Sequence, residues 1–142
     1  MPSNKLTIGD VEITSLSDGL LSFDLCNFFP SVPEDEWPEE HLNADHGVSF
    51  NLACFLIKSD GHTIAVDTGL GPKQTPETPW GNLLDDMKTH GTSPEDVDMV
   101  VMTHAHRDHV GWNLVSNDGK YSPTFPNAQY FLGAKDWEAC HN

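Results

Sequence analysis

Positively charged residues are scarce in this sequence. Its 142 residues include 7 lysines and arginines against 22 aspartates and glutamates, which gives a formal net charge of −15. A surface of this sign repels phosphate backbones and anionic lipid headgroups. We therefore expect neither a nucleic acid nor a membrane as a partner.

Cysteines and long apolar runs are also few. Cys26, Cys54 and Cys140 lie far apart and form no C-x-x-C pair, so a disulfide framework is not expected. The longest uninterrupted apolar run, at residues 52–57, is much shorter than a membrane span, and no secretory leader is visible. These absences predict a cytoplasmic protein with reduced cysteines.

The composition is that of one folded domain: 37% of the residues are hydrophobic. Residues 30–47 form a proline-containing stretch in which acidic side chains dominate. A solvated surface loop is the ordinary interpretation of such a stretch. A mobile cover over a binding site is the alternative, because long loops in compact domains often carry function.

Strand patterns dominate the first part of the chain, and helices alternate with strands later. The segments expected to be strands are residues 6–8, 11–14, 20–25, 50–58, 63–66, 97–102 and 129–132. The segments expected to be helical are residues 82–90, a short turn at 93–96 and residues 134–139. This order indicates an α/β or mixed α+β protein.

A dense group of histidines follows the predicted strand at residues 97–102. The segment THAHRDHVG places His104, His106, Asp108 and His109 within six positions. A polar loop can also contain these residue types, but the spacing favours a metal site. Residues two apart in an extended chain point to the same side, so His104 and His106 can converge on one ion. If the chain then turns, Asp108 and His109 can face a second ion.

Imidazole and carboxylate groups are ligands that suit zinc, and iron or manganese accepts them as well. The end of a buried strand gives such ligands a rigid base. Gly111, directly after the cluster, permits a tight backbone course. The sequence therefore predicts a metal site whose metal identity stays open.

The same segment resembles the metal-binding signature of the metallo-β-lactamase superfamily. AVDTG, at residues 65–69, resembles that family's first motif, and wider similarity extends from about residue 48 onward. FPNAQYFLGAKDWEA and the Trp112-Asn113 pair are similar to the branch that contains quorum-quenching lactonases and methyl parathion hydrolase. This resemblance implies a small-molecule substrate; the oligomeric state stays unknown.

The resemblance also implies roles for individual residues. His104 and His106 would hold the first metal ion, and Asp108 and His109 would hold the second. Asp108 would also take part in catalysis. Asp67 would be a buried carboxylate that supports the ligand loop from behind.

The family's fold is an αββα sandwich that needs a considerably longer chain. We therefore expect residues 1–142 to be the N-terminal half of such a domain, of class α+β, with the acidic loop at 30–47 and the metal loop at 103–112. The C-terminal half would be absent, and the remaining metal ligands would lie outside this chain.

The other histidines do not supply those ligands. Gly61-His62-Thr63 resembles the family's third-histidine motif, but it precedes the main cluster and lies in a predicted turn, so we interpret His62 as structural. His141 has no matching neighbours, and His41, His46 and His90 are interpreted as surface residues.

The activity that the resemblance implies is hydrolysis of a small ester or lactone, or of a phosphotriester, by a metal-bound hydroxide between two zinc ions. An iron-dependent redox enzyme on the same fold is the alternative, and an inactive binding module is another. This chain alone is expected to be inactive. Trp80, Trp112 and the Phe28-Phe29 pair are candidates either for an apolar pocket or for the core.

Overall fold

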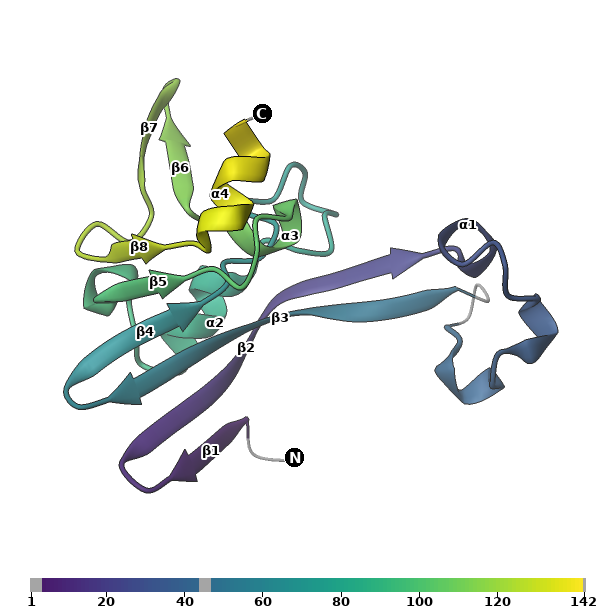
Figure 1. Ribbon diagram of the computed structural model, residues 1–142, viewed down its shortest axis with the longest axis horizontal. Helices are drawn as coiled ribbons and strands as arrows, with labels where there is room; N and C mark the ends of the chain where they lie inside the picture. The colour runs from purple at the N-terminus through teal and green to yellow at the C-terminus, as the bar shows by residue number, and fades with distance from the viewer. Residues whose placement is uncertain (1–3, 44–46, 142) are drawn as a thin grey trace.

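The computed structural model describes residues 4–43 and 47–141. Its main element is a six-stranded sheet with the strand order β1-β2-β3-β4-β5-β8 (Figure 1). The strands are β1 (Lys5–Ile8), β2 (Val11–Phe23), β3 (Val48–Ser59), β4 (His62–Val66), β5 (Met99–Val101) and β8 (Gln129–Phe131). A second, two-stranded sheet pairs β6 (Leu114–Asn117) with β7 (Lys120–Pro123).

The helices are short. The α-helices are α1 (Leu25–Phe28), α2 (Leu83–Thr89), α3 (Arg107–Val110) and α4 (Ala134–His141), and the 3-10 helices are η1 (Glu34–Glu36), η2 (Glu39–His41) and η3 (Pro94–Asp96). Strands and helices mix along the chain, so the expected α+β class is confirmed. No helix in the described part of the chain is long and apolar enough to cross a membrane.

Strand alternation decides which face of the sheet forms the core. Along β3, Leu52, Cys54 and Leu56 are buried while Phe55 is exposed, because successive side chains point to opposite faces. The buried face packs against α2 and the loops around it, and Met87 and Val100 lie in that core. The buried apolar residues of the central strands therefore form a core on the α2 side.

The direction of the strands changes across the sheet. β1 to β4 are antiparallel neighbours, whereas β4, β5 and β8 run parallel. Parallel strands end at the same edge of a sheet, and ligand sites collect at that edge in α/β arrangements. Asp67 follows β4 and Thr103 follows β5, so the two motifs of the sequence meet at one edge.

β2 and β3 form a long hairpin-like ribbon that reaches beyond the sheet to α1, η1 and η2 (Figure 1). A register shift between Ser17 and Leu20 interrupts their pairing where this ribbon leaves the core. Aromatic rings contact one another in the outer part: Phe23 lies 4.3 Å from Phe28 and 5.9 Å from Phe50 between ring centroids. We call residues 20–43 and 47–50 the arm.

Several sequence predictions needed correction. Residues 11–14 and 20–25 are parts of one strand up to Phe23, and the chain then turns into α1 because Asp24 caps it by accepting a hydrogen bond from the Asn27 amide. β5 is shorter than the expected 97–102. The β6–β7 hairpin was missed, although Asp118-Gly119 at its tip is a typical turn pair. Within residues 30–47, the described part contains two 3-10 turns.

Candidate metal centre

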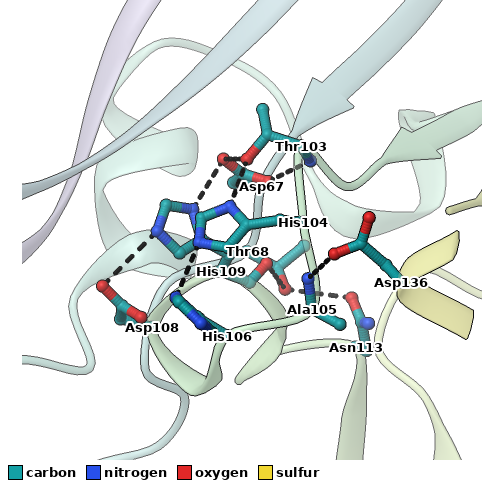
Figure 2. Close-up of polar contacts among 10 residues, drawn as sticks. All are labelled: Asp67, Thr68, Thr103, His104, Ala105, His106, Asp108, His109, Asn113 and Asp136. Atoms are coloured by element: carbon teal, nitrogen blue, oxygen red, sulfur yellow. Dashed lines mark hydrogen bonds and ion pairs between the residues drawn. The ribbon is translucent and has the colours of Figure 1, made fainter. Parts of the chain in front are cut away.

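The predicted metal loop lies directly after β5, and its side chains gather in one place (Figure 2). His106 precedes the first residue of α3, and Asp108 and His109 lie within that single helical turn. The chain is therefore extended up to His106 and turned after it, as the sequence predicted. This turn brings the three histidine rings together: the ring centroid of His104 lies 4.5 Å from that of His106 and 4.0 Å from that of His109.

The predicted ligands approach each other in two pairs. His104 Nε2 lies 3.0 Å from His106 Nδ1, and His109 Nε2 lies 3.4 Å from Asp108 Oδ2. Two nitrogens bound to one tetrahedral zinc at the usual bond length would lie about 3.3 Å apart. Each pair therefore has the spacing of two ligands that share an ion.

Hydrogen bonds to Nδ1 of His104 and His109 determine which ring nitrogen of each histidine is available to a metal. Asp67, as a carboxylate, can only accept hydrogen bonds. It accepts them from the Thr103 amide at 2.8 Å, from the Thr103 hydroxyl at 2.8 Å and from His109 Nδ1 at 2.8 Å (Figure 2). The Thr103 hydroxyl, having donated its proton, accepts from His104 Nδ1 at 3.1 Å. His104 and His109 both carry their proton on Nδ1 as a result, and Nε2 keeps the lone pair that a metal needs.

The backbone of Asp67 is itself unusual. Its φ is +59°, in the left-handed region that few residues other than glycine, asparagine and aspartate adopt. The residue is 7% exposed, and its amide donates to the Val101 carbonyl at 3.0 Å. A strained backbone that is held in place by several hydrogen bonds is typical of functional sites. Asp67 is thus buried against the ligand loop, and its effect on metal binding stays a prediction.

The backbone also ties the two motifs together. Thr68 donates its amide to the His109 carbonyl at 2.8 Å, and the Gly111 and Trp112 amides donate to the carbonyls of Gly69 and Thr68. Gly111 has an ordinary helical φ of −62°, so the turn expected there is not the reason for a glycine. Close packing explains the glycine at position 111, because a Cβ there would collide with the Leu70 carbonyl carbon.

Two carboxylates were missed from the sequence. Asp136 on α4 accepts a hydrogen bond from the Ala105 amide, between the first two histidines, at 3.3 Å (Figure 2). Asp18 on β2 accepts a hydrogen bond from the indole of Trp112 at 2.8 Å. Both are distant from the motif in sequence, and only the fold brings them to the loop. The Asp-Gly pair at residues 18–19, placed within a run of strand residues, was the one visible signal.

An apolar cavity opens beside Asp108 and His109. Its volume is about 530 Å³, and its wall comes from the arm and the adjoining part of β3. The lining residues include Leu21, Phe23, Phe28, Phe29, Phe50 and Leu52. Of the aromatic candidates from the sequence, the Phe28-Phe29 pair lines this cavity, whereas Trp112 is buried in the core.

The remaining histidines lie elsewhere. His62 begins β4 and is exposed, with Nδ1 3.8 Å from Asp98 Oδ2, which agrees with a structural interpretation. His90 lies 3.9 Å from Asp86 at the end of α2, and His41 is exposed on η2. His46 lies outside the described residues. Among the described residues, no group of three or more His, Cys, Asp or Glu side chains is arranged to hold one ion.

A metal centre therefore fits the donor chemistry in pairs only. The two imidazoles of His104 and His106 fit one ion, and the carboxylate of Asp108 with the imidazole of His109 fits another. Catalytic zinc usually has three protein ligands and a water. Each pair falls short of that number.

Comparisons with known proteins agree with this geometry. A family model described as "Metallo-beta-lactamase superfamily" matches residues 50–115, which contain both motifs. A computed overlay on the dizinc quorum-quenching lactonase AidC gives a TM-score of 0.82 with 27% identity over 94% of this chain. The match of residues 50–115 and this structural likeness support membership of the metallo-β-lactamase superfamily.

Other members are similar as well. The hydrolase AbOPH, described as a member of the beta lactamase superfamily, has a TM-score of 0.78 and 28% identity over 97% of this chain. Metallo-beta-lactamase domain-containing protein 1 of Mus musculus is 48% identical over 50 residues, which are 34% of this chain. The chain spans 45% of AidC, 47% of AbOPH and 16% of the mouse protein.

Proposed function

We propose that this superfamily member is a metal-dependent hydrolase of a small ester or lactone that carries an apolar group. The observation that carries the proposal is the position of the second donor pair in the wall of an apolar cavity, with the His104 ring centroid of the first pair 4.0 Å from that of His109. Asp108 and His109 belong both to the second pair and to the cavity wall. A substrate whose apolar part fills the cavity would thus present its reacting bond to the metal centre.

The chain's own residues have distinct tasks in this reaction. His104 and His106 would hold one metal ion, and Asp108 and His109 would hold the other. Bound divalent ions supply Lewis acidity and lower the pKa of a coordinated water. Asp108 would orient the attacking water, take up its proton on a carboxylate oxygen and pass that proton to the leaving oxygen.

The cavity supports an apolar substrate portion. Rings of Phe23, Phe28 and Phe50 form one wall, and burial of apolar surface against such a wall favours binding by about 25 cal/mol per Å². A substrate that fills this cavity would exclude water from it. Esters and lactones with an apolar chain or ring fit this description, and phosphotriesters with apolar substituents are the second substrate class.

Zinc is the metal that we propose, because its donors are imidazole and carboxylate and because AidC is a dizinc enzyme. Two protein ligands per ion are too few for a catalytic zinc. We propose that further ligands from outside these 142 residues complete each ion. The 142 residues by themselves would then be inactive.

Metal analysis and activity assays on the full-length protein test this function together. Protein grown without added metal should contain zinc, and it should hydrolyse lactones and esters with apolar groups. Removal of the metal with a chelator should abolish turnover, and added zinc should restore it. Iron in place of zinc, together with oxygen consumption and no hydrolysis, would instead establish the redox alternative.

A further inference from the structure

A buried carboxylate with no part in the proposed chemistry connects the sheet to the metal loop. Asp18 lies on β2 with none of its surface exposed. It lies in the register shift between Ser17 and Leu20, which interrupts the pairing of β2 with β3. Bulges of this kind are frequent beside active sites, where they redirect a side chain.

Asp18 holds three separate segments through its two carboxylate oxygens. Oδ2 accepts from the Leu70 amide at 2.8 Å, after the first motif. Oδ1 accepts from the Leu83 amide at 2.9 Å, at the first residue of α2, and from Trp112 Nε1 at 2.8 Å, after the second motif. All three donors are N–H groups, so the carboxylate is well satisfied although it is buried.

These contacts lie one step behind the ligands. Residues 68–69 form backbone hydrogen bonds with His109, Gly111 and Trp112. Leu70 directly follows the first of these two segments, and Trp112 ends the second. Gly69 lies against the Asp18 carboxylate so closely that a Cβ there would collide with it. A shift of Asp18 would therefore displace both partners of the His109 backbone contact.

We infer that Asp18 is a positioning residue that fixes the metal loop, and through it His109 and Asp108, relative to the sheet. The expected effect of Asp18 on metal binding rests on the proposed function. Its effect on the rigidity of the loop itself does not rest on that function. Carboxylates behind metal ligands typically change metal affinity by about 10–100-fold when they are removed.

The test compares Asp18→Asn with Asp86→Asn in the full-length protein. Asp86 is a matched control because its carboxylate accepts a hydrogen bond from the Ser17 amide at 2.8 Å, next to Asp18, but on the side of α2. An asparagine at position 18 has one acceptor oxygen and one NH₂ group, so it cannot satisfy all three donors. Trp112→Phe removes only the indole donor, and it is the test variant if Asp18→Asn does not fold.

Hydrogen exchange of the metal-free protein reads out the loop directly. In Asp18→Asn the Gly111 and Trp112 amides should exchange at least about tenfold faster than in the wild type, and in Trp112→Phe the same amides should accelerate to a smaller degree. The exchange rates of the Leu56 and Ile57 amides in β3 should change much less. Asp86→Asn should leave the loop amides unchanged. Uniform acceleration at all sites, or unchanged loop amides, would overturn the inference.

Cobalt binding then measures the consequence for the ligands. Asp18→Asn should raise the Co²⁺ dissociation constant about 10–100-fold and alter the visible spectrum of the Co²⁺-loaded protein, and Asp86→Asn should do neither. An unchanged spectrum and affinity in Asp18→Asn would contradict the positioning role. A wild-type protein that binds no Co²⁺ would instead refute the proposed function, and the exchange measurement would still decide whether Asp18 fixes the loop.

Discussion

The metal loop and the arm both contribute residues to the wall of the same cavity, and they are held in different ways. The metal loop is fixed by charge-assisted and backbone hydrogen bonds to Asp67, Thr68 and Asp18. The arm is held by the backbone pairing of β2 with β3, and its side chains contact one another as phenylalanine rings, two of which, Phe28 and Phe50, are nearly half exposed. Hydrogen bonds define directions, whereas apolar contacts tolerate repacking.

This difference matches the needs of the two sides. Metal ligands must keep their geometry within fractions of an ångström, so a loop with few alternative hydrogen-bond arrangements serves them. A wall for the apolar part of a substrate needs contact area rather than direction. We therefore expect substitutions in the loop to change catalysis and metal binding, and substitutions in the arm to change substrate preference.

The largest effect is expected at Asp108. Asp108→Ala removes one of the two donors of the second pair and the proposed proton acceptor, so hydrolysis by the full-length protein should be abolished. The fold should persist, because Asp108 lies in a partly exposed turn and not in the core. Turnover of esters, lactones and phosphotriesters would be measured beside circular dichroism, with Asp85→Ala on the exposed side of α2 as the control. Retained turnover would refute the role of Asp108.

Asp67→Asn should weaken metal binding about 10–100-fold without removing a ligand. Asparagine tolerates the left-handed backbone at this position, but its NH₂ group cannot accept the hydrogen bonds that orient His104 and His109. Asp60→Asn is the matched control, since Asp60 has a similar φ of +48° in a hairpin turn that is distant from the loop. Equal metal retention by both variants during dialysis against a chelator would show that Asp67 only shapes the turn.

Phe50→Ala tests the arm. It should raise KM for substrates with apolar groups by about tenfold or less and leave kcat nearly unchanged, because complete burial of a phenylalanine is worth about 1.5–3 kcal/mol and Phe50 is only partly covered. Phe55→Ala is the control: it is exposed to a similar degree, 41% against 44%, but lies outside this cavity. A fall in kcat with constant KM would mean that the arm, like the loop, positions catalytic groups.

The smallest effect concerns Cys54, a buried residue of β3. Burial, together with the charges of Asp18 and Asp67, raises the pKa of the Cys54 thiol to about 12. Cys54 should therefore stay protonated and unreactive toward a thiol reagent at pH 8, whereas the exposed Cys26 and Cys140 react. Because unfolding would release this thiol to its usual pKa, stability should fall as the pH rises from about 9 toward 12. Rapid labelling of all three cysteines in the native protein would contradict the packing around Asp18.

Sequence patterns were sufficient for the elements that follow from local periodicity. The β3–β4 hairpin, α2 and the strand before the histidines have regular apolar spacing and clear turn residues, so their positions were predicted well. The spacing of the histidine motif also predicted that its side chains can converge, whereas their roles as ligands stay a prediction from the resemblance. The approach of those side chains to one another is seen in the structure, while their binding of metal remains to be measured.

The contacts that could not be predicted are the long-range ones. Asp18 and Trp112 are 94 residues apart, and no local pattern links a strand aspartate to an indole at the end of the metal loop. The prediction divided the continuous β2 into residues 11–14 and 20–25, and the Asp18-Gly19 pair lies in the gap between them. In the fold it is a register shift that directs a carboxylate inward. The two cavity walls likewise come from distant segments that only the sheet brings together.

Location of metal in the full-length protein tests the central claim most directly. Crystals of the zinc-loaded protein, recorded for anomalous scattering at the zinc edge, should show one peak about 2.0–2.2 Å from His104 Nε2 and His106 Nδ1. A second peak should lie equally close to His109 Nε2 and an Asp108 oxygen. Zinc bound by other residues, or hydrolysis at full rate by protein without metal at these four side chains, would contradict the account.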